Sequence, residues 1–131
     1  MTPERLAKAA VAALENVKGH DIVVFDVRKL TAMFDRMVIA SGDSNRQVNA
    51  LARNVQNELK AAGAKVYGVE GEANGEWVLV DLGPVLVHIM HPTIRQYYNL
   101  EELWGGAPKP AKPARAAAPR KRVPARTSRS G

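Results

Sequence analysis

Two stretches of the chain repeat apolar residues at the spacing of an amphipathic helix. In residues 3–17 the apolar positions are Leu6, Ala10, Ala13, Leu14 and Val17, which fall on one helix face. Thr2 is placed to cap this helix, with Pro3 as its first residue, and Gly19 is placed to end it. The second stretch follows Ser44, has Val48, Leu51, Ala52, Val55 and Leu59 on one face, and ends at Gly63. Two helices that each bury one side are therefore expected.

Short apolar runs rich in β-branched residues predict five strands. The runs are residues 22–25, 37–40, 66–69, 77–82 and 85–90. Only Gly83-Pro84 separates the last two, so they are expected to pair as an antiparallel hairpin. Strands separated by a helix often run parallel. The pattern predicts an α/β fold: a mixed β-sheet of about five strands flanked by helices, with residues 91–104 as a short helical or irregular end.

Charge divides the chain into two parts at Gly105. The segment from Gly105 onward has eight basic residues and no acidic ones. The preceding part holds the other eleven basic and all thirteen acidic residues, a net charge of −2. Residues 105–131 are mostly Ala, Pro, Lys, Arg and Ser, and they carry too little apolar surface to offset chain entropy. We expect one domain over residues 1–104 and a disordered Ala/Pro/Lys/Arg-rich tail over 105–131.

Composition excludes several classes of protein. The chain has no cysteine, which excludes disulfides, thiolate metal sites and a cysteine nucleophile. No apolar run approaches the roughly 18 residues typical of a membrane span. The start of the chain is alanine-rich with interspersed charges such as Glu4 and Glu15, unlike a signal peptide. A cytoplasmic location without membrane association is the expectation.

The histidines give little support for a metal site. His88 and His91 are three positions apart, but His88 falls in a predicted strand that ends before His91. Their rings need not share a face, and no nearby carboxylate completes a ligand set. We expect no metal and no cofactor.

Carboxylates and glycine-rich turns give no better case for catalysis. Asp26, Asp35 and Asp81 lie at or near predicted strand ends, where α/β active sites often form, but turn and cap chemistry explains each of them. The acidic pair Glu70 and Glu72 falls in a glycine-rich turn, whereas a nucleotidyltransferase needs a strand-borne pair to hold magnesium. The segment 41–45 could bind an anion before the second helix, although a plain N-cap explains it better. The sequence predicts a protein that is not an enzyme.

The aromatic residues indicate a protein–protein interface instead. Four of the seven fall late in the domain: Trp77, Tyr97, Tyr98 and Trp104. Neighbouring residues on a helix do not share a face, so one of the two adjacent tyrosines is expected to be exposed. An exposed aromatic side chain offers a large contact area at small entropic cost, which is what an interface hot spot needs.

Several motifs together resemble the ribosomal silencing factors, the Iojap family. In the first half these are Asp21-Ile22 to Asp26-Val27, Asp35 followed by Val38-Ile39-Ala40-Ser41-Gly42, and Gln47-Val48. The central signature is Val69-Glu70-Gly71 followed by Trp77-Val78-Leu79-Val80-Asp81-Leu82-Gly83, and the end is Val87-His88 with Arg95-x-Tyr97-Tyr98-x-Leu100-Glu101-x-Leu103-Trp104. The resemblance spans about residues 6–104. Many members have Tyr-Phe after the position of Asp35, where this chain has Arg36-Met37, so no aromatic role is carried over there.

The resemblance implies a function without turnover. It implies a nucleotidyltransferase-like fold without the catalytic carboxylates, and a translational repressor that binds the large ribosomal subunit through ribosomal protein L fourteen. A domain bound there would sterically block joining of the small subunit. The family's contact surface corresponds here to Trp77, Leu82 and Tyr98. Leu82, at the hairpin turn, is expected to be exposed.

Two other functions compete with this interpretation. A nucleotidyltransferase-like enzyme is disfavoured by the missing carboxylate pair. A nucleic-acid-binding module driven by the basic tail is compatible with the first interpretation, because ribosomal RNA surrounds any protein site on the large subunit. Contacts of the tail with ribosomal RNA are therefore kept as a further partner hypothesis. A homodimer is kept as another.

Overall fold

The computed structural model of the chain describes residues 1–98 and 109–110. Its elements are, in chain order, α1 (Pro3–Asn16), β1 (His20–Asp26), β2 (Arg36–Ser41), α2 (Asn45–Ala61), β3 (Gly68–Glu70), β4 (Trp77–Asp81), β5 (Val85–Met90), α3 (Pro92–Tyr98) and β6 (Lys109–Pro110). The predicted α/β class, both long helices and all five predicted strands are confirmed.

Local capping chemistry explains where the long helices begin and end. The Thr2 hydroxyl accepts a hydrogen bond from the Arg5 amide at 3.2 Å, which caps α1 ahead of its proline. Ser44 caps α2 in the same way through the Gln47 amide at 3.1 Å. After α2, Gly63 has a φ of 93°, a left-handed conformation that stops a helix and suits glycine. The predicted caps and the role of Gly63 are confirmed.

The sheet has the order β3-β4-β5-β2-β1-β6. β4 and β5 pair antiparallel as predicted, and β2 pairs parallel with β5. The two strands on either side of α2 run in the same direction, but β4 and β5 lie between them. The β4–β5 hairpin thus lies between β3 and β2. This arrangement depends on long-range pairing, which local sequence patterns do not specify.

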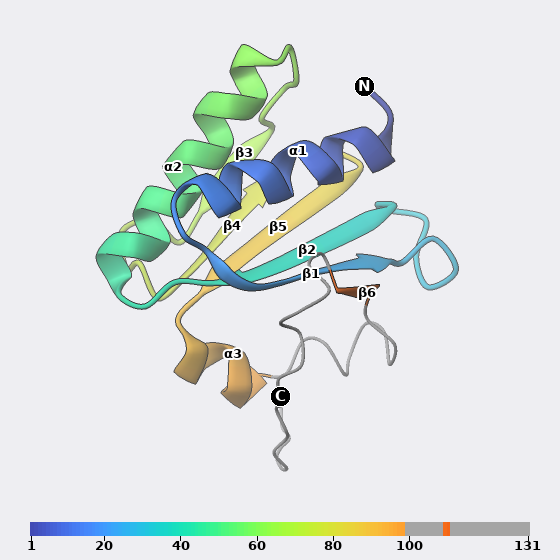
Figure 1. The fold of residues 1–131 in the computed structure, drawn as a ribbon. Coiled ribbons are helices and arrows are strands. Elements are labelled where there is room, and N and C mark those ends of the chain that lie inside the picture. The colour runs from blue at the N-terminus through green and yellow to red at the C-terminus, as the bar shows by residue number, and fades with distance from the viewer. Residues whose placement is uncertain (99–108, 111–131) are drawn as a thin grey trace.

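The helices α1 and α2 lie together on one face of the sheet, and α3 lies toward the other face (Figure 1). The side of the sheet under α1 and α2, the helix face, is aliphatic and almost fully buried. Its strand residues are Ile22, Val38, Ala40, Val78, Val80, Val85, Val87 and Ile89. The opposite side, the second face, has its own cluster of Phe25, Val27, Met37, Ile39 and Met90, against which Ile94 of α3 packs.

The end of the chain is described only in part. α3 falls in the segment expected to be helical or irregular. Within the segment expected to be disordered, Lys109–Pro110 form β6, which pairs antiparallel with Val23 and Val24 of β1. This two-residue strand departs from the expectation, whereas residues 99–108 and 111–131 lie outside the described residues, so disorder there stays a prediction. In the described part of the chain, no helix combines the length and hydropathy needed to cross a bilayer.

Candidate partner-binding face

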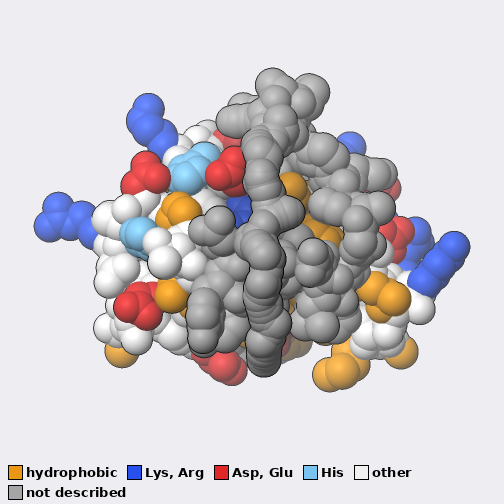
Figure 2. Space-filling model, turned by 90° about the horizontal axis from the view of Figure 1, so that it is seen from below, with side chains coloured by type: hydrophobic (Ala, Val, Ile, Leu, Met, Phe, Trp, Pro, Cys, Tyr) orange, Lys and Arg blue, Asp and Glu red, His pale blue; other side chains and the backbone are white. Residues whose placement is uncertain are grey.

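The burial of side chains on the second face decreases from one side of the sheet to the other. Toward β2 its side chains are buried, and toward β4 they are half-buried. The half-buried residues are Trp77, Leu79 and Asp81 of β4 with Leu86 and His88 of β5. Figure 2 looks onto this side of the molecule and shows hydrophobic side chains among histidine and carboxylate side chains. This face therefore combines apolar area with polar groups, the composition of a protein-binding surface.

Trp77 is held by a specific contact with His88. The indole Nε1–H donates a hydrogen bond to His88 Nδ1 at 3.0 Å. The two ring centroids are 5.8 Å apart, with the planes tilted by 51°. Trp77 pairs with Met90 and His88 pairs with Leu79, so the two rings are diagonal neighbours on the same face of the hairpin.

This contact fixes the protonation state of His88. An indole nitrogen can only donate, so His88 Nδ1 must carry a lone pair and the ring proton must lie on Nε2. Burial lowers the pKa of His88 to about 4. The acceptor role of Nδ1 and the lowered pKa both correspond to a neutral ring near neutral pH, so the hydrogen bond is available there.

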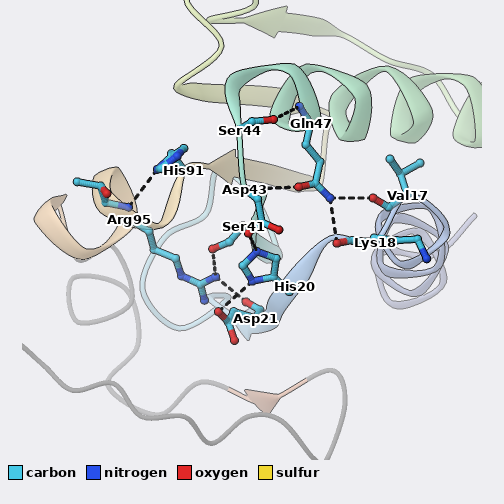
Figure 3. A network of polar contacts seen from close by, with 11 residues as sticks. Val17, Lys18, His20, Asp21, Ser41, Asp43, Ser44, Gln47, His91 and Arg95 are labelled. Atoms are coloured by element: carbon cyan, nitrogen blue, oxygen red, sulfur yellow. Dashed lines mark hydrogen bonds and ion pairs between the residues drawn. The ribbon is translucent and has the colours of Figure 1, made fainter.

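A second polar contact ties α3 to the sheet. Arg95 Nη1 donates to the Asp21 carbonyl oxygen at 2.6 Å and to Ser41 Oγ at 2.9 Å (Figure 3). Ser41, at the end of β2, is only 1% exposed. A guanidinium that donates to groups from two strands sets the direction in which α3 leaves the sheet. Arg95 thereby positions the helix that ends at Tyr98.

A polar network beside Arg95 joins the ends of α1 and α2. Gln47 Nε2 donates to the carbonyl oxygens of Val17 and Lys18, both at 3.1 Å, and its Oε1 accepts from the Asp43 amide at 2.6 Å (Figure 3). His20 lies between two carboxylates, with Nε2 2.7 Å from Asp43 Oδ1. Together with the Ser44 cap, these contacts give segment 41–45 the capping role expected of it.

The prediction that Leu82 is exposed is wrong. Its side chain is 1% exposed and belongs to the helix-face core. Successive residues of a strand point to opposite faces, and Leu82 is five positions after Trp77, so the two lie on opposite faces about 16 Å apart along the strand. A partner contact at this turn would therefore have to involve other side chains.

Tyr67 occupies the surface where Leu82 was expected. It is 59% exposed, and its ring covers Gly83, where an added Cβ would lie 2.8 Å from the ring. Gly83 has a φ of 90°, so glycine is required at this turn both for its backbone and for the space. Lys65 Nζ lies 4.9 Å from the centre of the Tyr67 ring. Sequence analysis missed Tyr67 because the predicted strand 66–69 included it, whereas β3 begins at Gly68.

The third predicted contact residue, Tyr98, is the last residue of α3. Its backbone lies in that helix, and the position of its side chain lies outside the described residues. Trp77 and Ile94 of α3 pack against the same hydrophobic cluster. The structure thus brings Trp77 and the helix that carries Tyr98 to the same face and leaves Leu82 on the other.

Two of the candidate catalytic carboxylates, Asp26 and Asp81, have structural roles. Asp26 accepts from Arg28 at 2.6 and 2.9 Å, and this contact holds the pKa of Asp26 well below its usual range. Asp81 Oδ1 accepts from the Gly83 amide at 2.9 Å, the turn chemistry expected of it. Among the described residues, no three His, Asp or Glu side chains are grouped as metal ligands.

Comparison with known proteins identifies relatives along most of the chain. Residues 1–130 match the family model described as "Ribosomal silencing factor during starvation". A ribosomal silencing factor of Chromobacterium violaceum is 53% identical over 119 residues, covering 91% of this chain and 97% of that protein. The mouse protein named "Mitochondrial assembly of ribosomal large subunit protein 1" is 32% identical over 97 residues, covering 72% of this chain and 42% of that protein.

A solved structure supports the same relationship. The X-ray crystal structure of a Chromobacterium violaceum protein aligns with a TM-score of 0.79 at 51% identity. The alignment covers 88% of this chain and 98% of the crystallised one. The expected family resemblance is confirmed in both sequence and fold.

Proposed function

The chain belongs to the ribosomal silencing factor family, which regulates translation at the ribosome, and we propose that it acts by binding the large ribosomal subunit and blocking its joining to the small subunit. The proposed contact is ribosomal protein L fourteen, and the proposed place of action is the cytoplasm. The mechanism is steric occlusion, so it needs no catalytic group and no cofactor. The name of the mouse relative, which refers to the ribosomal large subunit, supports this choice of subunit.

The observation that carries the proposal is Trp77 on the second face. Its large indole lies on the same face of the hairpin as Leu79 and Leu86, and a hydrogen bond to His88 holds it in place. Tryptophan contributes more to interfaces than other residues because it buries much area with few rotatable bonds. We therefore place the partner site on the β4–β5 part of the second face, together with Tyr98 of α3.

Leu82 keeps an indirect role in this proposal. Because it is buried, it supports the turn from below, while Tyr67 and Gly83 form the outer surface of that turn. Replacing Leu82 would then weaken binding by moving the turn. Tyr67→Ala would test a direct contact there, since the exposed ring can be removed without opening the core.

Two measurements test the proposed function. The purified protein, added to separated subunits, should co-sediment with the large subunit in a sucrose gradient and not with the small one. In a light-scattering assay of subunit joining, it should reduce the extent of joining in proportion to the bound fraction. Co-sedimentation without any effect on joining would overturn the occlusion mechanism, and absence from the large-subunit fraction would overturn the proposal as a whole.

A further inference from the structure

His88 is a half-buried polar residue that the proposed contact surface does not itself require. A strand position facing an apolar cluster would ordinarily be filled by an aliphatic residue, as the neighbouring positions Leu86 and Met90 are. Burying an imidazole costs free energy unless its nitrogen atoms are satisfied. The Trp77 indole N–H satisfies Nδ1 at 3.0 Å, so the two side chains are matched to each other.

The geometry of the pair restricts Trp77. The two rings come from paired strands whose register is fixed by the two-residue turn between them, so the acceptor Nδ1 is at a fixed place relative to the Trp77 backbone. A hydrogen bond of ordinary length to the indole Nε1 favours one combination of the two side-chain torsions of Trp77. The ring contact at 5.8 Å adds to this selection.

We propose that His88 is a positioning residue for partner binding, which holds the Trp77 indole in the orientation that the ribosomal partner recognises. This inference rests on the proposed function and adds to it the residue that prepares the contact. A side chain that is already ordered loses less conformational entropy when it binds. His88 therefore raises affinity by ordering Trp77 before the partner binds.

Two replacements of His88 separate positioning from simple packing. His88→Leu replaces the imidazole with an apolar side chain of similar size and so removes the acceptor. His88→Asn places an amide oxygen near the position of Nδ1, so it can still accept from the indole. We expect His88→Leu to weaken binding to large subunits about five- to tenfold, and His88→Asn to restore most of the loss.

A double-substitution cycle provides the decisive control. Trp77→Phe keeps an aromatic ring but has no indole donor. In the Trp77→Phe background, His88→Leu should have no further effect on affinity, because there is no indole N–H to position. A purely structural role of His88 would instead reduce affinity by the same factor in both backgrounds, and that result would overturn the proposal.

A spectroscopic readout follows the contact in the free protein. The chain has two tryptophans, so its two indole N–H signals in a ¹H–¹⁵N spectrum can be assigned with Trp77→Phe. His88→Leu should shift the Trp77 signal and speed its exchange with solvent, whereas His88→Asn should leave it near its original position. An unchanged Trp77 signal in His88→Leu would overturn the inference.

The experiment distinguishes failure of this inference from failure of the proposed function. If the unsubstituted protein does not bind large subunits, the proposed function fails, and the positioning role falls with it. If the unsubstituted protein binds and folded His88→Leu binds equally well, only the positioning role fails.

Discussion

The two faces of the sheet differ in the kind of side chain that they use. On the helix face the strand residues are aliphatic, and most have no exposed surface. The second face carries aromatic, methionine, histidine and serine side chains, and directional hydrogen bonds link Trp77 to His88 and Arg95 to Ser41. The hydrophobic driving force is not directional, whereas a hydrogen bond favours one orientation of the groups that it joins.

The comparison separates stability from recognition. The helix-face cluster is aliphatic and contributes burial of apolar area, the main favourable term in folding. The second face buries less apolar area, and it carries polar groups that each need a hydrogen-bond partner. Substitutions on the helix face should therefore change the free energy of unfolding, and those on the second face should mainly change binding.

Leu51→Ala should give the largest effect. Leu51 lies in α2 with no exposed surface and packs in the helix-face core. Removing a buried leucine side chain leaves a cavity and costs about 4 kcal/mol of unfolding free energy. Chemical denaturation measures this loss, and affinity for large subunits, corrected for the folded fraction, should be unchanged. A loss of less than about 1 kcal/mol would contradict the assignment of this face as the stabilising one.

The pH dependence of stability should identify His88. Its pKa falls from 6.5 in the unfolded chain to about 4 in the folded protein. The unfolded state therefore binds the extra proton between these values, so stability is full above pH 6.5 and is lost as pH falls toward 4. The shift corresponds to about 3 kcal/mol.

The measurement compares unfolding curves between pH 7.5 and pH 4 for the unsubstituted protein and His88→Leu. The variant keeps His20, His91 and every carboxylate, so the difference between the two profiles isolates His88. Asp26 does not interfere, because its lowered pKa makes its contribution fall only below its usual value of 3.8. Parallel profiles would show that the folded environment does not lower the pKa of His88.

Trp77→Ala should weaken binding more than it weakens the fold. Truncation of an interface anchor typically costs about 2 kcal/mol or more. That corresponds to about a thirtyfold loss of affinity for large subunits. Asn57→Ala, at an exposed neutral position of α2, is the matched control and should bind normally. A folded Trp77→Ala protein with unchanged affinity would remove Trp77 from the proposed site.

Arg95→Ala should have a smaller effect on stability, because it removes a charged donor from the buried Ser41 hydroxyl. The cost of a hydrogen bond to a charged group is about 1.5 kcal/mol. Adding Ser41→Ala also removes the hydroxyl that has lost its donor. The double variant should therefore lose less unfolding free energy than the sum of the losses in the two single variants. Additive losses would show that the contact at 2.9 Å contributes no coupling.

The sequence predicts where the helices and strands lie better than it predicts which strands pair with each other. The helices follow from their apolar spacing and from the caps Thr2, Ser44 and Gly63, which are local signals. The pairing of β2 with β5 joins segments more than 40 residues apart, and no local pattern specifies it. The order of the sheet therefore had to come from the structure.

In the candidate site, strand alternation and hairpin register could be predicted from the sequence, whereas the side-chain contact could not. The error on Leu82 was avoidable. Strand alternation from Trp77 already places Leu82 on the opposite face, so its burial could have been predicted. The two-residue turn at Gly83-Pro84 also fixes the hairpin register, which makes Trp77 and His88 diagonal neighbours. The hydrogen bond between them depends on side-chain torsions, and those required the structure.

The basic segment after Trp104 is predicted to make the smallest contribution, through charge alone. Residues 105–131 have eight basic residues and no acidic ones, beside a domain of net charge −2. Such a segment can contact ribosomal RNA phosphates without reading sequence. If about four of its charges do so, the slope of log affinity against log salt should steepen by roughly three units.

Truncation after Trp104 tests this contribution against the alternative of a solvated tail that only aids solubility. Binding of both chains to large subunits is measured across a range of salt concentrations. The truncated protein should still bind, more weakly at low salt and with a shallower slope, and the two chains should converge at high salt because screening removes the phosphate contacts. Identical slopes would make the tail a bystander. Complete loss of binding would place the main site outside the second face, because Trp77 and α3 are intact in the truncated chain.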